Sequence, residues 1–132
     1  MDANNREPDP IKIVVIDDDR VTLTMLETFL KKQGFQVAAA QDGETGFALV
    51  QHERPDIVIT DMLIPKVHGI DLCQKIKSDD GLKHTAVILM TAVYKGLAFK
   101  QDVNEAGADF CIEKPLDMAK ILELVKTCTK SL

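Results

Sequence analysis

Five short runs of apolar residues, rich in β-branched side chains, divide the chain at regular intervals. Three of them are strong, at residues 11–16, 56–60 and 86–90, and two are weaker, at residues 36–40 and 109–113. An apolar run without polar alternation is typical of a strand that is buried on both faces, as in a parallel sheet. The two weaker runs are typical of strands at the edges of such a sheet.

Between these runs the apolar positions change to a helical spacing. Leu23, Leu26 and Leu30 form one stripe after Asp19, and Gly34 follows where a left-handed cap would end a helix. In the last segment, apolar residues recur at helical spacing from Met118 onwards. The full set of predicted helices is the one after Asp19 and those at residues 43–53, 69–77, 96–106 and 118–128.

The alternation of strand and helix, repeated five times, predicts an α/β fold. Short loops and buried strands favour a parallel sheet joined by right-handed crossovers, with helices on both faces. Five such units fit a flavodoxin-like (βα)5 doubly wound sandwich with strand order 2-1-3-4-5. Residues 1–10 contain two prolines and no apolar periodicity, and are predicted to be a flexible N-terminal tail before one folded domain at 11–132.

Acidic and polar side chains stand where four of the predicted strands end. The first strand leads into residues 17–19, all aspartates, and the third into Asp61, while the fourth ends at Thr91 and the fifth at Lys114. In the predicted strand order these residues converge on one crevice. Carboxylates so close disfavour one another's ionisation unless a cation lies among them, and an all-oxygen cluster suits Mg²⁺. A divalent ion, a lysine and a threonine around one carboxylate also leave that carboxylate as a nucleophile toward a phosphoryl group.

Four segments carry a resemblance to a known family. VVIDDD, PDIVITDMLIPKVHG, ILMTA and AGADFCIEKP, in this order, resemble the receiver domain of bacterial response regulators, the CheY-like family, over residues 11–131. The resemblance implies that Asp61 is the phosphoacceptor. It also implies that Asp17 and Asp18 hold Mg²⁺ together with Asp61 and the backbone carbonyl of Leu63.

The same resemblance assigns the switch. It implies that Thr91 is the hydroxyl that closes on the phosphoryl group, that Lys114 pairs with that group, and that the bond to Pro115 is cis. The family usually has an aromatic residue three positions before the lysine, where this chain has Cys111. Phe110 is adjacent, but neighbouring strand residues point to opposite faces, so only a bulge would let it take that place.

A function follows from the resemblance. A phosphohistidine of a sensor histidine kinase or a phosphotransfer protein gives its phosphoryl group to Asp61. The modified domain then changes its binding to an output partner or output domain. The resemblance places this binding on the face of the helix predicted at 96–106, the strand at 109–113 and the helix at 118–128, with a phosphorylation-dependent dimer as one form of output. Such a domain phosphorylates and dephosphorylates itself and is not a turnover enzyme.

Two other functions would fit parts of this pattern. An aspartate-nucleophile phosphatase would share the sheet and the Mg²⁺, but such enzymes use a second aspartate two residues after the nucleophile, where this chain has Leu63. A module that docks without being phosphorylated is the other alternative. The intact Asp61, Thr91 and Lys114 speak against it, and Cys111 speaks for it. The sequence fits both a single-domain regulator and a module of a longer protein, and it names neither the kinase nor the output.

The composition of the chain limits the class of protein and its cellular location. Hydrophobic residues make up 45% and charged residues 28%, which predicts a folded domain and not a disordered chain. The net charge of −5 argues against direct nucleic-acid binding. We expect no membrane span and a cytoplasmic location, because no apolar run is long enough and the first ten residues are polar. Cys73, Cys111 and Cys128 form no CxxC pair and are expected to be reduced thiols.

Overall fold

The computed structural model describes residues 10–92 and 102–129. Its elements, in chain order, are β1 (Lys12–Ile16), α1 (Arg20–Lys32), β2 (Gln36–Ala40), α2 (Gly43–Glu53), β3 (Ile57–Asp61), α3 (Gly69–Ser78), β4 (Ala86–Thr91), β5 (Phe110–Glu113) and α5 (Met118–Thr129). Residues 102–106 are also helical. Residues 1–9 of the predicted tail and the first part of the helix predicted at 96–106 lie outside the described residues.

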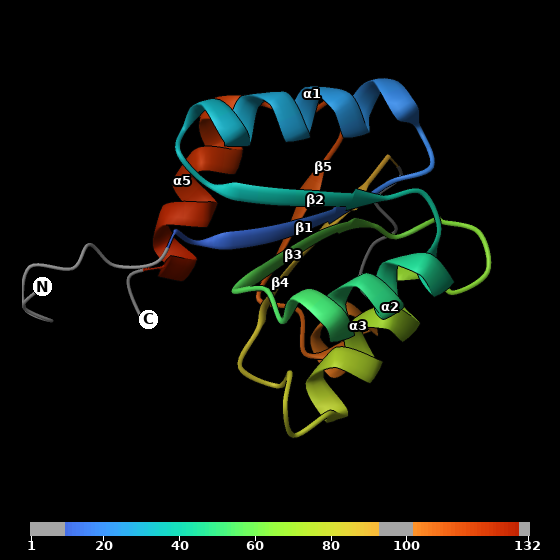
Figure 1. Cartoon of the computed structure of the whole chain (residues 1–132). Coiled ribbons are helices and arrows are strands. Elements are labelled where there is room, and N and C mark those ends of the chain that lie inside the picture. The colour runs from blue at the N-terminus through green and yellow to red at the C-terminus, as the bar shows by residue number, and fades with distance from the viewer. Residues whose placement is uncertain (1–9, 93–101, 130–132) are drawn as a thin grey trace, which may run out of the picture.

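The five strands form one parallel sheet in the order β2-β1-β3-β4-β5, so the predicted fold and strand order are confirmed. Figure 1 shows the sheet between two layers of helices, with α1 and α5 over one face and α2 and α3 over the other. The three central strands are buried along almost their whole length, whereas β2 and β5 at the edges are partly exposed. The weaker apolar runs in the sequence are therefore the edge strands.

Each face of the sheet buries its own apolar cluster. On one face, Leu26 and Leu30 of α1 pack with Ile121 and Val125 of α5 against the central strands. The opposite cluster contains Leu72 and other apolar residues of α2, α3 and the helical residues 102–106. Burying a side chain of this size contributes about 1.5–3 kcal/mol. Packing on both faces therefore fixes the edge of the sheet where the strands end. Among the described residues, no helix has the length and apolar character to cross a membrane.

Of the three aspartates in the turn after β1, Asp19 is the one that caps helix α1. The Asp19 side chain accepts hydrogen bonds from the Val21 amide at 3.1 Å and from Thr22 Oγ1 at 2.8 Å, and so caps the start of α1. At the other end, Gly34 has a φ of 95°, the left-handed conformation that the sequence predicts there. Since Asp19 is engaged in the cap, Asp17 is free of that local role.

A strained turn lies in the loop between β3 and α3. The amide of Val67 donates a hydrogen bond to the carbonyl of Pro65 at 2.9 Å, and Lys66 between them has a φ of 74°. A hydrogen bond across a single residue with positive φ defines a γ-turn of the rare, strained kind. Any side chain other than glycine is disfavoured at such a φ. The contacts around this loop must therefore hold Lys66 in a conformation that lysine does not prefer.

Replacing Lys66 with glycine should stabilise the protein. Glycine adopts positive φ without the steric cost, so we expect Lys66→Gly to raise the free energy of unfolding by about 1 kcal/mol. Denaturant unfolding followed by circular dichroism measures this change. Lys83→Gly is the matched control, because Lys83 is an exposed turn lysine that is not among the residues with positive φ. There glycine should lower the free energy of unfolding, and a decrease at both positions would contradict the strain.

Candidate functional site

Three carboxylates meet at the ends of neighbouring strands. Asp17 directly follows β1 and Asp61 ends β3, and the pairing of Ile16 with Thr60 places them side by side. With Asp18, they offer oxygen atoms that all lie within 4.8 Å of one another. The side chain of Asp17 is fully buried, that of Asp61 is almost so, and that of Asp18 is exposed. The structure thus brings the predicted acidic residues into one cluster.

Lys114 reaches into this cluster from β5. Its Nζ donates to Asp17 Oδ2 at 2.6 Å and to Asp61 Oδ2 at 3.2 Å. Its backbone is fixed as well, because its amide donates to the carbonyl of Thr91 at 2.8 Å. The following bond to Pro115 is cis. One ammonium therefore bridges the carboxylates of two strands that are not neighbours of its own.

The remaining oxygens of the two bridged carboxylates bind backbone amides. Asp17 Oδ1 accepts from the Asp19 amide at 2.9 Å, and Asp61 Oδ1 accepts from the Leu63 amide at 3.4 Å. Each of these carboxylates thus has one oxygen toward Lys114 and the other toward the backbone of the loop that follows it. The cluster is anchored by hydrogen bonds on both sides.

Burial governs how this cluster ionises. Burial raises the pKa of Asp17 above its ordinary value of 3.8, although the hydrogen bond from Lys114 acts in the opposite direction. For Lys114, burial alone would lower the pKa, but the hydrogen bond to Asp17 and the charges of Asp17 and Asp61 raise it above 10.5. Because the folded state binds the Asp17 proton more tightly than the unfolded state does, protonated Asp17 adds to the free energy of unfolding at low pH when no other cation is bound. This contribution is lost as the pH rises through the raised pKa. Lys114 stays cationic, and its one positive charge faces three acidic side chains.

The donor set fits Mg²⁺. Carboxylate oxygens from Asp17, Asp18 and Asp61 are the hard ligands that this ion takes, with water completing its coordination. No sulfur or imidazole nitrogen belongs to the cluster, so the chemistry does not suit zinc. Leu63 is the second residue of the loop after β3 and is 64% exposed. The assignment of its backbone carbonyl as a further ligand stays a prediction.

Thr91 lies beside the carboxylates at the end of β4. Thr91 is 3% exposed, and it directly follows Met90, the residue of β4 that pairs with Asp61. The structure thus brings Thr91 to the same edge of the sheet as Asp61 and Lys114. Its role as the switch hydroxyl stays a prediction, and residues 93–101 after it lie outside the described part of the chain.

The position that the family fills with an aromatic residue is exposed here. The ladder between β4 and β5 is unbroken, with Ile88 opposite Phe110 and Leu89 opposite Cys111, so no bulge turns Phe110 toward the other face. Phe110 packs with the α1 and α5 cluster, and Cys111 is exposed. The sequence-based expectation that Phe110 does not replace the missing aromatic residue agrees with this register.

Sequence reasoning did not single out the glycine that begins α3. A Cβ at Gly69 would lie 2.5 Å from the carbonyl oxygen of Asp61 and 2.7 Å from Met62 Cα. The amide of Gly69 also donates to the Met62 carbonyl at 3.0 Å. Only a glycine lets α3 begin this close to the end of β3. The signal was present, since Gly69 closes the segment PDIVITDMLIPKVHG, but the sequence does not reveal what the glycine contacts.

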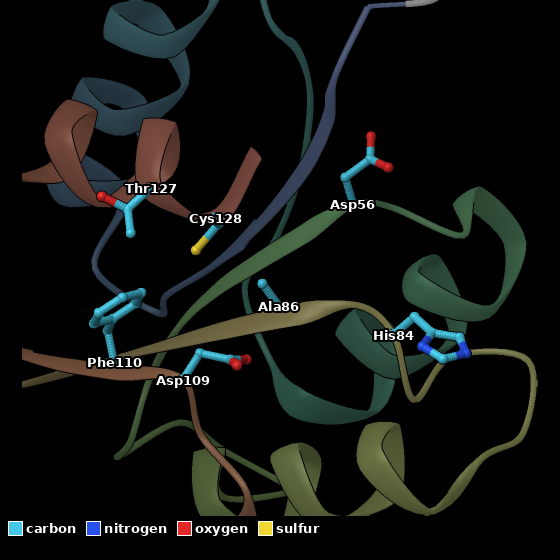
Figure 2. A pocket seen from close by; sticks show the side chains of 7 residues that line it. All are labelled: Asp56, His84, Ala86, Asp109, Phe110, Thr127 and Cys128. Atoms are coloured by element: carbon cyan, nitrogen blue, oxygen red, sulfur yellow. The ribbon is translucent and has the colours of Figure 1, made fainter. Parts of the chain in front are cut away.

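A hollow of about 570 Å³ lies at the opposite end of the sheet. Its lining includes Asp56, His84, Asp109 and Cys128, which Figure 2 shows coming from different elements without converging on one point. Asp109 Oδ2 already accepts from the Lys77 ammonium at 3.0 Å and from the Val87 amide at 2.8 Å. Within residues 10–92 and 102–129, only the cluster at the other end of the sheet has three acidic, histidine or cysteine ligands close enough for a metal.

Comparisons with known proteins agree with this geometry. The family model described as "Response regulator receiver domain" matches residues 13–126. Protein PilG of Pseudomonas aeruginosa is 31% identical over 92% of this chain and 89% of its own length. The response regulator PleD of Caulobacter vibrioides is 31% identical over 90% of this chain, which spans only 26% of PleD. The structure of the chemotaxis response regulator CheY4 of Vibrio cholerae superposes with a TM-score of 0.84 over 91% of this chain and 99% of that one, at 23% identity, and so supports the fold.

Removing a carboxylate should remove the response to Mg²⁺. At about 100 times its Kd, a ligand that binds only the folded state adds about 2.7 kcal/mol to the free energy of unfolding. We expect Mg²⁺ to stabilise the wild-type protein in this way and to stabilise Asp17→Asn far less. Without Mg²⁺ the same variant should be at least as stable as the wild type at pH 7, because it removes a carboxylate whose ionised form burial disfavours.

Denaturant unfolding with and without Mg²⁺ measures both effects. Asp71→Asn is the matched control, because Asp71 is an exposed residue in the first turn of α3 and does not belong to the cluster. This variant should keep the full Mg²⁺ effect. Equal stabilisation of all three proteins by Mg²⁺ would show that the ion binds elsewhere.

Proposed function

Because this chain belongs to the response regulator receiver domain family, we propose that it is a binding switch controlled by phosphorylation of Asp61. The phosphoryl group comes from a phosphohistidine of a sensor histidine kinase or a phosphotransfer protein. The observation that supports this most directly is the bridge from Lys114 to Asp17 and Asp61 inside a cluster of three carboxylates.

The transfer is a substitution at phosphorus. A carboxylate oxygen of Asp61 forms a bond to the phosphorus atom while the bond to the donor's imidazole nitrogen breaks, and the electron pair leaves with that nitrogen. Asp17, Asp18 and Asp61 are the residues that would hold Mg²⁺, which neutralises charge on the phosphoryl oxygens when bound. Lys114 lies 3.2 Å from Asp61 Oδ2 and supplies a second positive charge at the same place.

The product of the proposed transfer is the phosphorylated domain itself, and no phosphorylated compound is released. The residue two positions after Asp61 is Leu63, which offers no acid to protonate a leaving group, so steady hydrolysis of phosphomonoesters is not expected. Instead, the phosphoryl group gains Thr91 and Lys114 as partners, and its own hydrolysis resets the domain. In this proposal the output partner or output domain binds the face of the helix predicted at 96–106, β5 and α5, in the cytoplasm.

The test of this function is direct phosphorylation of the purified protein. Incubation with acetyl phosphate and Mg²⁺ should add one phosphoryl group to the wild type, seen as an increase in intact mass. Omitting Mg²⁺ or replacing Asp61 with asparagine should abolish the adduct, because the first removes charge neutralisation and the second removes the nucleophile.

The matched control is Asp56→Asn. Asp56 precedes the same strand at its other end, where its side chain accepts from the Lys12 amide at 2.9 Å, a role that an asparagine oxygen can keep. This variant should be phosphorylated like the wild type. A wild-type protein that gains no phosphoryl group, and gives no response to beryllofluoride, would point to the module that docks without phosphorylation.

The switch should work without an aromatic residue on β5. We propose that output is carried by the loop after Thr91 and by the helix predicted at 96–106, since Cys111 is exposed and Phe110 is packed into the opposite face. Cys111→Tyr should therefore leave the beryllofluoride-induced amide chemical shift changes of residues 102–106 unchanged, as measured by NMR. Thr91→Ala should abolish most of them. A large increase in these changes in Cys111→Tyr would show that the aromatic position matters.

A further inference from the structure

We propose that Gly43, the first residue of α2, is a positioning residue for the loop between β3 and α3. This loop follows Asp61, the last residue of β3, and carries Leu63, and the start of α2 lies against it at Val67. The proposal rests on the proposed function, because the loop it concerns is the one that presents ligands to Mg²⁺ during phosphorylation of Asp61.

The two segments are too close for any side chain at this position. A Cβ built on Gly43 would lie 2.0 Å from the carbonyl oxygen of Val67, 2.6 Å from Val67 Cβ and 2.7 Å from its carbonyl carbon. These are backbone atoms and the root of a side chain, so no rotamer change can make room. Adding one methyl group to Gly43 must therefore move either the start of α2 or the loop itself.

A hydrogen bond joins the same two segments. The amide of Gly43 donates to the carbonyl of Pro65 at 3.0 Å, and that carbonyl also accepts from the Val67 amide, which closes the γ-turn. The first amides of a helix have no partner within it, so this bond satisfies one that would otherwise need water. The start of α2 thus supports the turn in which Lys66 takes its strained φ of 74°.

The loop is held at its other end as well. The Met62 amide donates to the Met90 carbonyl of β4 at 2.9 Å, and Gly69 lies against the carbonyl of Asp61. Leu63 stands between these contacts and the Gly43 contact at Pro65. Leu63 is only two residues from Pro65, so a displacement of the turn at Pro65 also moves the backbone of Leu63. By this route Gly43 sets the position of the loop without contacting the ion or the phosphoryl group.

Gly43→Ala tests the proposal. Residues that orient metal ligands typically change metal affinity by about 10–100-fold when they are altered, and we expect a loss of this size. The Mg²⁺ concentration that gives half of the maximal rate of phosphorylation by acetyl phosphate should rise accordingly. The Mg²⁺ dependence of the unfolding midpoint should shift by the same factor, and this readout does not depend on phosphorylation.

Gly46→Ala is the matched control in the same helix. A Cβ at Gly46 would also be crowded, at 2.6 Å, but the atom it meets is Cδ1 of Ile16, the mobile end of a side chain in the core. This variant carries the same chemical change and a comparable loss of space, without contact with the loop. It should keep the wild-type Mg²⁺ dependence in both measurements. Equal Mg²⁺ dependence in Gly43→Ala, Gly46→Ala and the wild type would overturn the proposal.

A measurement on the unaltered protein covers the case in which Gly43→Ala does not fold. The Gly43 amide bonds to the loop, whereas the Gly46 amide bonds within its own helix start, to the Asp42 carbonyl at 2.9 Å. Saturating Mg²⁺ should slow hydrogen exchange at Gly43 more than at Gly46, and equal protection of the two amides would contradict the role of Gly43. A wild-type protein that binds Mg²⁺ but gains no phosphoryl group would instead overturn the proposed function.

Discussion

The carboxyl edge of this sheet is organised by charge repulsion among three aspartates and by the single ammonium that opposes it. Two unit charges about 4 Å apart interact with roughly 4 kcal/mol at the effective dielectric constant of a protein surface, so Asp17, Asp18 and Asp61 cannot be gathered without compensation. Lys114 supplies part of it through bonds to the two more buried carboxylates. The strand order is what allows this, because β5 must lie two places from β3 for the lysine to cross β4 and reach both. The same incomplete compensation leaves the cluster with an affinity for a cation.

Prior pairing of Lys114 limits how much phosphorylation can change the domain. Moving a two-state equilibrium from 1:99 to 99:1 requires about 5.5 kcal/mol of differential interaction, while one hydrogen bond to a charged group contributes about 1.5–3 kcal/mol. Because Lys114 already bonds to Asp17 at 2.6 Å and to Asp61 at 3.2 Å, its gain on phosphorylation is only the difference between two ionic pairings. In the proposed switch, contacts of Thr91 and of the chain after it provide much of the bias. A partner that binds the active form preferentially would supply the remainder.

The sequence predicted the order of the strands and the meeting of Asp17, Asp61 and Lys114. Apolar runs mark the buried strands, and the residues that follow parallel strands lie close together at one end of the sheet. Strand boundaries were less accurate. The fifth strand begins at Phe110 and not at residue 109, since the Asp109 side chain takes the Val87 amide as a partner. The strain at Lys66 and the contact between Gly43 and Val67 were not predictable. Lysine has no preference for positive φ, and a glycine after a helix cap does not reveal which distant backbone lies against it.

The register of β5 explains why the neighbouring Phe110 does not fill the aromatic position. A slip of one residue would turn Phe110 toward the face of Cys111. Because side chains alternate along a strand, all the remaining residues of β5 would change faces as well. Phe110 and Ile112 would leave the cluster under α1 and α5, and Glu113, now exposed, would turn toward that apolar cluster. The same slip would shift Lys114 away from the two carboxylates. The lysine and the core thus fix the register together, and a phenylalanine that could have served switching contributes to stability instead.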